Sequence, residues 1–598
     1  MSDYVAPVRD MEFAMKELGG IDEVAKLPGN EDFSEDLAVS VLEEAAKFAN
    51  GVLSPLNVVG DREGAKWTPE GVKTAPGWTA ANTQFSEAGW GGIACETEFG
   101  GQGMPKLLAT PVMEMWKGAN MAFSLCSMLT NGAIEALTLC GNEEQKQMYL
   151  PKMVSGEWTG TMNLTEPNAG SDLAAVRAKA EPVGDGTYKI FGQKIFITYG
   201  DHDMTENIIH LVLARLPDAP EGVKGISLFV VPKFMVNPDG SIGERNDAYC
   251  VSIEHKLGIH GSPTAVMAFG DKGGAIGTLV GEPNRGLEYM FIMMNAARFA
   301  VGMEGLGLSE RAYQQAVEYA RERIQGTEAG VRGGPKVPII RHADVRRMLM
   351  LMKSQIEAMR ALSVYVGAAF DHARSNPDEA ERKRNQGFVD LMIPVVKGWF
   401  TENSVDLTSL GVQVHGGMGF IEETGAAQHF RDSRITPIYE GTTGIQATDL
   451  IGRKIAREKG VTVKNFIAQM RETEKELEKA SGDNFAAMHR ALTTGISALD
   501  AAVDSILATY GENIKAAQVG SVPFLKLLGI VSGGWLMAKS AMIAQQRLDE
   551  GQGDPAFYKA KITTARFYAD HVLSQASGLS YAVINGAAGA LDLEDDAF

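Results

Sequence analysis

One stretch of the chain, residues 161–283, has a residue pattern unlike that of its flanks. Short runs of β-branched and aromatic residues are separated there by Gly, Pro and Asp, which is typical of strands joined by turns. No helical segment alternates with these runs and no GxGxxG follows one, so the pattern predicts an antiparallel sheet or small barrel rather than a dinucleotide-binding Rossmann unit. The predicted strands are residues 188–198, 208–213, 226–231, 249–254 and 265–269.

Both flanks show apolar residues at helical spacing instead. The N-terminal flank predicts a helix over 33–50 that stops at Asn50-Gly51, and a helical region over 110–150 interrupted near Asn131-Gly132 and Gly141-Asn142. The C-terminal flank predicts helices over 350–374, 386–410 and 485–510, the last ending at Gly511. The apolar stretch 524–544 contains two lysines and three glycines, so we interpret it as a buried helix and not a membrane span.

This order of patterns predicts an α+β fold in five segments. They are an N-terminal extension (1–37), an N-terminal helical domain (38–160), a middle antiparallel β-barrel or sheet domain (161–283), a C-terminal helical bundle (284–460) and an additional helical domain (461–598).

Charge and cysteine content exclude several function classes. The formal net charge of −19 disfavours binding to phosphate backbones, so no nucleic-acid partner is expected. The four cysteines are far apart and form no CxxC pair, which disfavours a metal site and a disulfide framework and is typical of a reducing compartment. We expect each to be a small buried hydrophobe. The acidic N-terminus lacks a basic start followed by an apolar run, so neither a secretory signal nor a transit peptide is predicted, and the expected location is cytoplasmic.

Four segments carry residues that suit binding or catalysis. MNLTEPNAGSD (162–172) places hydroxyls and glycine amides at a turn, where they can approach an anion or a polar ring; an ordinary turn explains it equally well. GQKIFIT (192–198) ends a strand with an aromatic residue that could stack on a flat ring, although a plain core strand is the simpler interpretation.

The other two segments lie in the C-terminal flank. GVQVHGGMGF (411–420) contains glycines that permit close backbone approach, or simply a helix end, and we interpret His415 as a packing residue. RITPIYEGTTGIQ (434–446) sets Glu440 among apolar neighbours, where burial would raise the pKa of its carboxyl and prepare it as a base. Alone, Glu440 could equally pair with a buried arginine.

In this order across a helix–sheet–helix chain, the four motifs resemble those of the acyl-CoA dehydrogenase family. GWGG…EFGGQG (89–103), GNEEQKQMYLPKMVSGEW (141–158) and KLGIHGSP (256–263) also resemble it, and the likeness covers roughly residues 38–460. With its N-terminal extension and C-terminal block, the chain is similar to a long bacterial subgroup of that family.

The resemblance implies a FAD cofactor and names its contacts. The residues implied to touch FAD are Leu164, Thr165, Gly170, Ser171, Phe196, Ile197, Thr198 and Thr442, with Arg323, Gln325, Gln413, Gly416 and Gly417 acting across a dimer interface. Two positions depart from the commonest family pattern: Phe196 stands where many members have Trp, and Met162 where many have an aromatic residue. The Gly-rich stretch after Gln325 is longer than usual.

The resemblance also implies the chemistry. Glu440 would remove the α-proton of an acyl-CoA while the β-carbon passes a hydride to the flavin. Ser171, Arg298, Tyr439 and Gly441 would contact the substrate. Some members carry the base on an earlier helix, but the corresponding position here is Ala297, which cannot serve.

The expected reaction is α,β-dehydrogenation of a thioester to the trans-2-enoyl-CoA. Similarity to the long subgroup favours 3-(methylthio)propanoyl-CoA, giving 3-(methylthio)acryloyl-CoA in dimethylsulfoniopropionate breakdown; a general fatty acyl-CoA dehydrogenase of β-oxidation and an acyl-CoA oxidase are alternatives. A DNA-associated relative would need a basic surface, and a nitroalkane-oxidising relative would have Asp at position 440. The expected partners are electron-transfer flavoprotein and further copies of the chain, as a dimer or tetramer.

Overall fold

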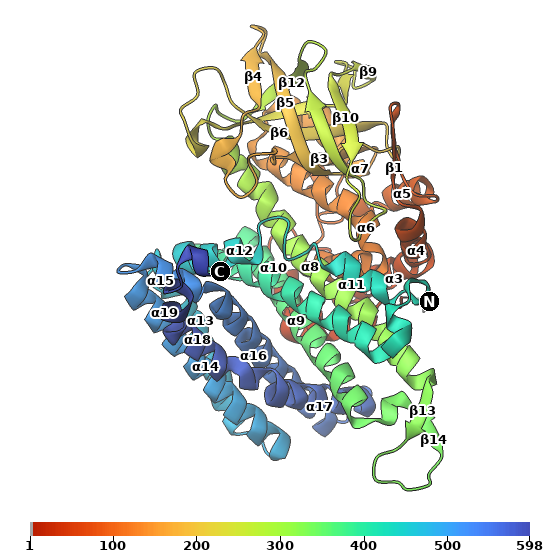
Figure 1. Ribbon diagram of the computed structural model, residues 1–598, viewed down its shortest axis with the longest axis vertical. Helices are drawn as coiled ribbons and strands as arrows, with labels where there is room; N and C mark the ends of the chain where they lie inside the picture. Colours follow the sequence, from red (N-terminus) through yellow and green to blue (C-terminus); the bar gives the residue numbers. More distant parts are fainter. Residues whose placement is uncertain (1–3) are drawn as a thin grey trace. The chain divides into compact units, whose positions relative to one another are not determined.

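The computed structural model describes residues 4–598, which form two compact units (Figure 1). Unit 1 combines the described part of Met1–Ala46 with Pro105–Gly118 and Val301–Phe598, and unit 2 combines Lys47–Met104 with Ala119–Ala300. The chain passes from one unit to the other four times: near the end of helix α3 (Glu35–Phe48), between Met104 and Pro105, and inside helices α6 (Lys106–Cys140) and α8 (Gly286–Glu322). The five segments expected from the sequence follow chain order and stay a prediction.

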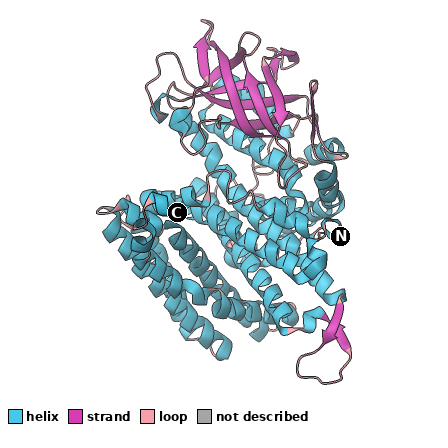
Figure 2. Ribbon diagram, in the orientation of Figure 1, coloured by secondary structure: helices cyan, strands magenta, loops and turns pink. Residues whose placement is uncertain are grey.

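Unit 2 contains an eight-stranded sheet, drawn in magenta in Figure 2. Its strands run in the order β10-β11-β5-β12-β7-β6-β3, and β4 pairs with β5. The sheet strands are β3 (Trp158–Asn163), β4 (Lys179–Pro182), β5 (Thr187–Thr198), β6 (Asn207–Ala214), β7 (Ser227–Pro232), β10 (Ala248–Ile253), β11 (Thr264–Phe269) and β12 (Ala275–Val280). Two hairpins accompany it, β1–β2 (Lys66–Thr68, Gly71–Lys73) and β8–β9 (Phe234–Val236, Ile242–Arg245).

The five predicted strands are confirmed to within one residue at each end, four of them inside the sheet and the fifth, β10, at its edge. Every residue of β6 and β7 is buried. Consecutive side chains of β6, such as Leu211 and Val212, belong to different hydrophobic clusters, one on each face of the sheet. The first cluster includes residues of α6, α7 (Glu143–Ser155) and α8, so helices cover that face of the sheet.

The expectation of a wholly antiparallel sheet is wrong at one edge. Strand β3 pairs with β6 in parallel, with Trp158 opposite Asn207 and Asn163 opposite Val212. All six residues of β3 are buried, but its sequence WTGTMN contains two threonines, a glycine and an asparagine, so it shows neither the continuous apolar run of β6 and β7 nor the alternation of a half-buried strand. The other sheet pairings are antiparallel.

Two predicted helix breaks are also wrong. Helix α6 runs through Asn131-Gly132 without a break, and its one non-helical residue is Asn120. The helix α3 (Glu35–Phe48) does not stop at Asn50-Gly51 but continues through a π-helical turn (Ala49–Leu53) into α4 (Ser54–Glu63). The break at Gly141-Asn142 is confirmed, because Asn142 caps α7 by accepting a hydrogen bond from the backbone N–H of Gln145 at 2.8 Å.

Unit 1 is a helix bundle with one exposed hairpin, β13–β14 (Ile324–Thr327, Lys336–Pro338). The predicted helices 350–374, 386–410 and 485–510 lie within α9, α10 and α14. The remaining helices in the described chain are α1 (Val8–Phe13), α2 (Ile21–Ala25), α5 (Trp78–Glu87, in unit 2), α9 (Ala343–Ser375), α10 (Glu379–His415), α11 (Ala426–Ser433), α12 (Thr443–Asp449), α13 (Val461–Glu478), α14 (Asp483–Tyr510), α15 (Ile514–Val519), α16 (Ser521–Asp549), α17 (Pro555–His571), α18 (Ala576–Asn585) and α19 (Ala587–Leu591).

Helix α16 is the buried centre of the C-terminal block. Helices α6, α14 and α16 are long and apolar enough to cross a bilayer by length and composition, and 61%, 39% and 83% of their most apolar windows are buried inside the protein. The glycines of α16 permit close contact with α10: a Cβ placed on Gly529 would lie 2.5 Å from the ring of Trp399. The high burial of α16 therefore serves helix packing.

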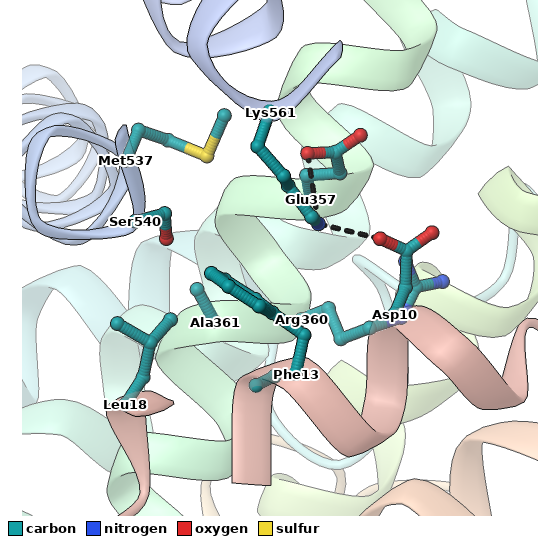
Figure 3. A pocket seen from close by; sticks show the side chains of 10 residues that line it. Asp10, Phe13, Leu18, Glu357, Arg360, Ala361, Met537, Ser540 and Lys561 are labelled. Carbon is teal, nitrogen blue, oxygen red and sulfur yellow. Dashed lines mark hydrogen bonds and ion pairs between the residues drawn. The ribbon is translucent and has the colours of Figure 1, made fainter. Parts of the chain in front are cut away.

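The N-terminal segment is joined to the C-terminal block by buried charges (Figure 3). Lys561 of α17 lies 2.5 Å from Asp10 of α1 and 3.1 Å from Glu357 of α9. These side chains border a cavity of about 10 Å³, which has room for roughly one water molecule and none for an acyl chain. The cavity is therefore a gap in helix packing and not a substrate site.

Cysteine burial differs from the sequence-based expectation. Cys126 is buried, whereas Cys95, Cys140 and Cys250 are half-buried, and none of the four is in a disulfide. Three of the four thiols are therefore only partly shielded from solvent.

The contact of α16 with α10 can be tested at Gly529. We expect Gly529→Ala to lower the thermal midpoint of unfolding, because overpacking a tight contact costs about 1–3 kcal/mol and exceeds the gain in helix propensity of up to about 1 kcal/mol. Gly578→Ala in α18 is the control, since a Cβ there meets nothing within 4 Å. Differential scanning calorimetry would contradict the packing role of Gly529 if both variants raised the midpoint equally.

Candidate active site

The predicted site residues are distributed over both units, and each group has its own local geometry. Unit 2 carries Leu164, Thr165, Gly170, Ser171, Phe196, Ile197, Thr198 and Arg298, whereas unit 1 carries Arg323, Gln325, Gln413, Gly416, Gly417, Tyr439, Glu440, Gly441 and Thr442.

The first motif forms a tight turn after β3. The backbone N–H groups of Glu166 and Ala169 each donate to the other's carbonyl oxygen at 3.0 Å, which turns the chain around Pro167-Asn168. Gly170 and Ser171 follow the turn and are exposed, and a Cβ on Gly170 would meet nothing within 4 Å. The loop therefore offers open backbone and a free-standing hydroxyl to a ligand.

A buried ion pair joins this turn to β5. Lys194 Nζ donates to Glu166 Oε1 at 2.8 Å and to the Leu164 carbonyl oxygen at 3.1 Å. Glu166 also accepts the backbone N–H groups of Arg177 at 2.7 Å and Ala178 at 3.0 Å. Burial lowers the pKa of Lys194 to about 8, so the ammonium stays charged at neutral pH. The pair fixes the first two motifs against each other.

Phe196 lies in a bulge of β5 that presents its ring to solvent. The pairing with β11 shifts register there, so that Ile195 and Phe196 together oppose Val266. Phe196 has φ +59°, a left-handed conformation that costs a non-glycine residue roughly 1–3 kcal/mol, and it is 58% exposed. A strained backbone that exposes a large aromatic ring is suited to stacking on a flat ligand.

The remaining predicted contacts of unit 2 are less accessible. Leu164 and Ile197 are buried in the core, so only their backbone can face a ligand, and Thr198 is half-buried. Arg298 on α8 is buried, with Nη1 3.4 Å from Asn295 Oδ1 and its guanidinium 5.9 Å from the Phe291 ring centroid.

In unit 1, Glu440 lies on the loop between α11 and α12. Its φ is +56°, and Gly441 follows with φ +86°. Gln446 Nε2 donates to the carbonyl oxygens of Glu440 at 3.2 Å and Gly441 at 3.3 Å, and the Thr442 hydroxyl caps α12 by accepting from the Ile445 N–H at 3.3 Å. Glu440 is half-buried, so the apolar burial expected from its neighbours is only partial.

Tyr439, the residue before Glu440, is held by a hydrogen bond from its side chain. The Tyr439 hydroxyl donates to Glu304 Oε2 of α8, and Lys117 Nζ of α6 donates to Glu304 Oε1 at 3.1 Å. Lys117 and Glu304 are 1% and 0% exposed. Tyr439 was expected to contact substrate, but its hydroxyl is already bound within unit 1.

The residues expected at a subunit interface are all exposed. Gln413, Gly416 and Gly417 end α10, and Arg323 and Gln325 begin the β13–β14 hairpin. The long Gly-rich stretch after Gln325 is the loop of this hairpin. His415 is buried, its Nδ1 lies 2.7 Å from the Gly411 carbonyl oxygen, and its ring stacks on Tyr319, as expected of a packing residue.

Sequence reasoning missed both buried ion pairs at the site. Glu166 and Lys194 belong to quoted motifs but were given no role, and Glu304 and Lys117 belong to none. The available signal was an isolated charge in an apolar helical run, such as Glu304 in FAVGMEGLG, or two charges three residues apart, such as Glu114 and Lys117 in EMWKGAN, because such charges need buried partners. The partner itself lies far away in the sequence.

Comparison with known proteins agrees with this arrangement. Family profiles described as the N-terminal domain, middle domain and C-terminal domain of acyl-CoA dehydrogenase match residues 39–157, 161–271 and 284–456. A fourth, described as acetyl-CoA dehydrogenase C-terminal like, matches residues 466–594.

Individual relatives extend the match to nearly the whole chain. A 3-methylmercaptopropionyl-CoA dehydrogenase of Ruegeria pomeroyi is 48% identical over 96% of this chain and 97% of the relative. A butyryl-CoA dehydrogenase of Syntrophomonas wolfei is 36% identical over 100% and 99%. A solved acyl-CoA dehydrogenase of Bacillus anthracis, complexed with FAD, shares the fold with a TM-score of 0.73, at 22% identity over 96% of this chain and 91% of that one. The chain belongs to the acyl-CoA dehydrogenase family.

Proposed function

We propose that this acyl-CoA dehydrogenase oxidises 3-(methylthio)propanoyl-CoA to 3-(methylthio)acryloyl-CoA, with Glu440 as the base that removes the α-proton. The substrate assignment is supported by the 48% identity to the Ruegeria pomeroyi enzyme over nearly the full length of both chains. The butyryl-CoA dehydrogenase is more distant, at 36%. A straight-chain acyl-CoA is therefore the second candidate. The methylthio substrate would place the enzyme in dimethylsulfoniopropionate breakdown.

FAD is the cofactor, and the residues of unit 2 fit it. The exposed Phe196 ring suits the face of a flavin, and the open loop at Gly170 and Ser171 suits its polar edge. Thr165 and Thr198 add hydroxyls beside them, while Leu164 and Ile197 can contribute backbone groups only. When bound, FAD supplies the two-electron acceptor for the oxidation.

The observation that carries the catalytic assignment is the left-handed backbone conformation of Glu440. The thioester acidifies the α-carbon, and a carboxylate can remove that proton if it is held within reach. The left-handed φ of Glu440 costs free energy because Glu440 is not a glycine, and such strain is concentrated at functional sites. The Glu440 N–H can donate to the thioester oxygen as negative charge develops there.

The substrate contacts implied by the family resemblance differ in how well their local geometry fits. Ser171 is exposed and Gly441 is half-buried, and both can offer polar groups. Arg298 is the cation proposed for the CoA portion, which gives an anionic ligand a local positive charge on a chain of net charge −19. Tyr439 would contact substrate through its ring, since its hydroxyl is bound by Glu304.

We assign electron-transfer flavoprotein as the acceptor, a homo-oligomer as the assembly and the cytoplasm as the location. The exposed Gln413, Gly416, Gly417, Arg323 and Gln325 support a shared flavin site, because their groups are accessible to a second copy. A dimer would satisfy this requirement, and so would a tetramer built from dimers.

The Glu166–Lys194 ion pair predicts that changes at its two residues affect FAD binding in a non-additive way. We expect Lys194→Met and Glu166→Gln each to lower FAD content and thermal stability, because removing one partner of a buried pair costs about 3–5 kcal/mol. The double variant should lose less than the sum of the two. Flavin absorbance per chain after gel filtration measures the effect, and full FAD content in Lys194→Met would refute this role of the pair.

The base assignment predicts a selective loss of chemistry. Glu440→Gln is nearly isosteric, so the variant should keep FAD and bind acyl-CoA. We expect anaerobic flavin reduction to slow by about 10⁴-fold or more, at or beyond the upper end of the usual contribution of a general base, since Ala297 offers no substitute. Stopped-flow absorbance measures the rate, and reduction within about tenfold of the unmodified enzyme would mean that the base is elsewhere.

The substrate assignment predicts a ranking of kcat/KM. Among acyl-CoAs from C3 to C16 and 3-(methylthio)propanoyl-CoA, we expect the methylthio thioester to rank first, with reduced electron-transfer flavoprotein as product. A straight-chain substrate in first place would favour the second candidate. Rapid reoxidation of the substrate-reduced enzyme by air would instead identify an oxidase.

A further inference from the structure

We infer that the buried ion pair Lys117–Glu304 positions the catalytic base by holding the hydroxyl of Tyr439, the residue that immediately precedes Glu440. This role rests on the proposed function of Glu440. Glu304 and Lys117 are then positioning residues, which act on the reaction through Tyr439 without touching substrate.

The first support is the rigidity of the acceptor. Glu304 uses one carboxylate oxygen for Lys117 and the other for Tyr439, and both charged side chains are almost completely buried. A buried carboxylate without partners is strongly unfavourable, so the pair has one arrangement that satisfies it. The two charges come from α6 and α8, whose backbones are fixed by the bundle.

The second support is that Tyr439 remains a donor. Burial first, and then the carboxylates of Glu304 and Glu440, raise the pKa of Tyr439 well above its usual value. The hydroxyl therefore keeps its proton at all pH values at which the enzyme would work. A hydrogen bond to an ionised acceptor is stronger than one between neutral groups, so this contact is a firm anchor for the loop.

The third support is the strained backbone of Glu440, which needs restraints on both sides. Glu440, a non-glycine residue, has a left-handed φ, and a strained backbone persists only where its surroundings over-determine it. After the bend, Gln446 holds the carbonyl oxygens of Glu440 and Gly441. Before the bend, the contact of Tyr439 with Glu304 supplies the matching restraint. Loss of either restraint would let the Glu440 carboxylate shift.

The test compares two variants, each of which loses one tyrosine hydroxyl that donates a hydrogen bond inside unit 1. Tyr439→Phe removes the bond to Glu304, whereas the control Tyr568→Phe removes a bond to the Ile530 carbonyl oxygen in α16 at 3.0 Å. We expect anaerobic flavin reduction at saturating substrate to be about 10²-fold slower in Tyr439→Phe, the loss expected from a small misplacement of a reacting group. FAD content and substrate Kd should be unchanged, and the control should reduce its flavin at the normal rate.

A double-mutant cycle shows whether Glu304 acts through Tyr439. Glu304→Leu, which removes both acceptor oxygens, should also slow flavin reduction, and adding it to Tyr439→Phe should cause no further loss, since both changes break the same bond. Glu304→Leu/Lys117→Met repeats the test without an unpaired buried lysine if the single variant does not fold. Independent, multiplying losses would overturn the inference, as would flavin reduction in Tyr439→Phe as fast as in the control.

Glu440→Gln separates this inference from the function on which it rests. If Glu440→Gln shows no flavin reduction while Tyr439→Phe reduces its flavin at the normal rate, Glu440 remains the base and only the positioning role of Tyr439 and Glu304 is overturned. An active Glu440→Gln would overturn both. Slow flavin reduction in Tyr439→Phe, with the substrate deuterium isotope effect of α-deuterated acyl-CoA increased, supports both.

Discussion

Helices α6, α8 and α9 are cross-linked by one buried arginine, on which the bundle of unit 1 depends. Arg360 Nη2 lies 2.5 Å from Glu114 Oε1 and 2.7 Å from Glu310 Oε2, and all three side chains are buried. Burial raises the pKa of Glu114 to about 7 despite the arginine, so the cluster is stable only while its partners stay together. Lys117 and Glu304 repeat the device on α6 and α8, next to the loop of Glu440.

Each unit therefore has a buried ion pair beside a loop that carries proposed site residues. In unit 2 the Glu166–Lys194 pair includes a residue of β5, the strand that carries the exposed Phe196. In unit 1 the Lys117–Glu304 pair binds Tyr439, the neighbour of Glu440. A buried ion pair adds little net stability compared with apolar packing. What it provides is directional: in unit 2 the charged hydrogen bonds fix the backbone at Leu164, Arg177 and Ala178, and in unit 1 they hold the hydroxyl of Tyr439.

Local pattern explains which features the sequence could predict. Strands such as β5 and helices such as α14 follow from residue spacing, because each buries the face that the pattern marks. Strand β3 is buried but has the largely polar sequence WTGTMN, which is neither an apolar run nor an alternating pattern, and Gly132 packs tightly inside α6 instead of breaking it. Motifs located Glu440, but its anchor at Glu304 was hidden, since no local pattern relates residues 135 positions apart.

The contact between Asp10 and Lys561 has a consequence for biosynthesis. A ribosome adds roughly 5–20 residues per second, so Asp10 leaves the tunnel roughly half a minute to two minutes before Lys561 is made. Unit 2 lies within Lys47–Ala300 and can fold during that interval. Until α17 is made, Phe13 lacks the rings of Phe557 and Tyr558 against which it packs in the finished protein. Nascent chains stalled before α17 would therefore expose this aromatic surface and be the form that most needs a chaperone.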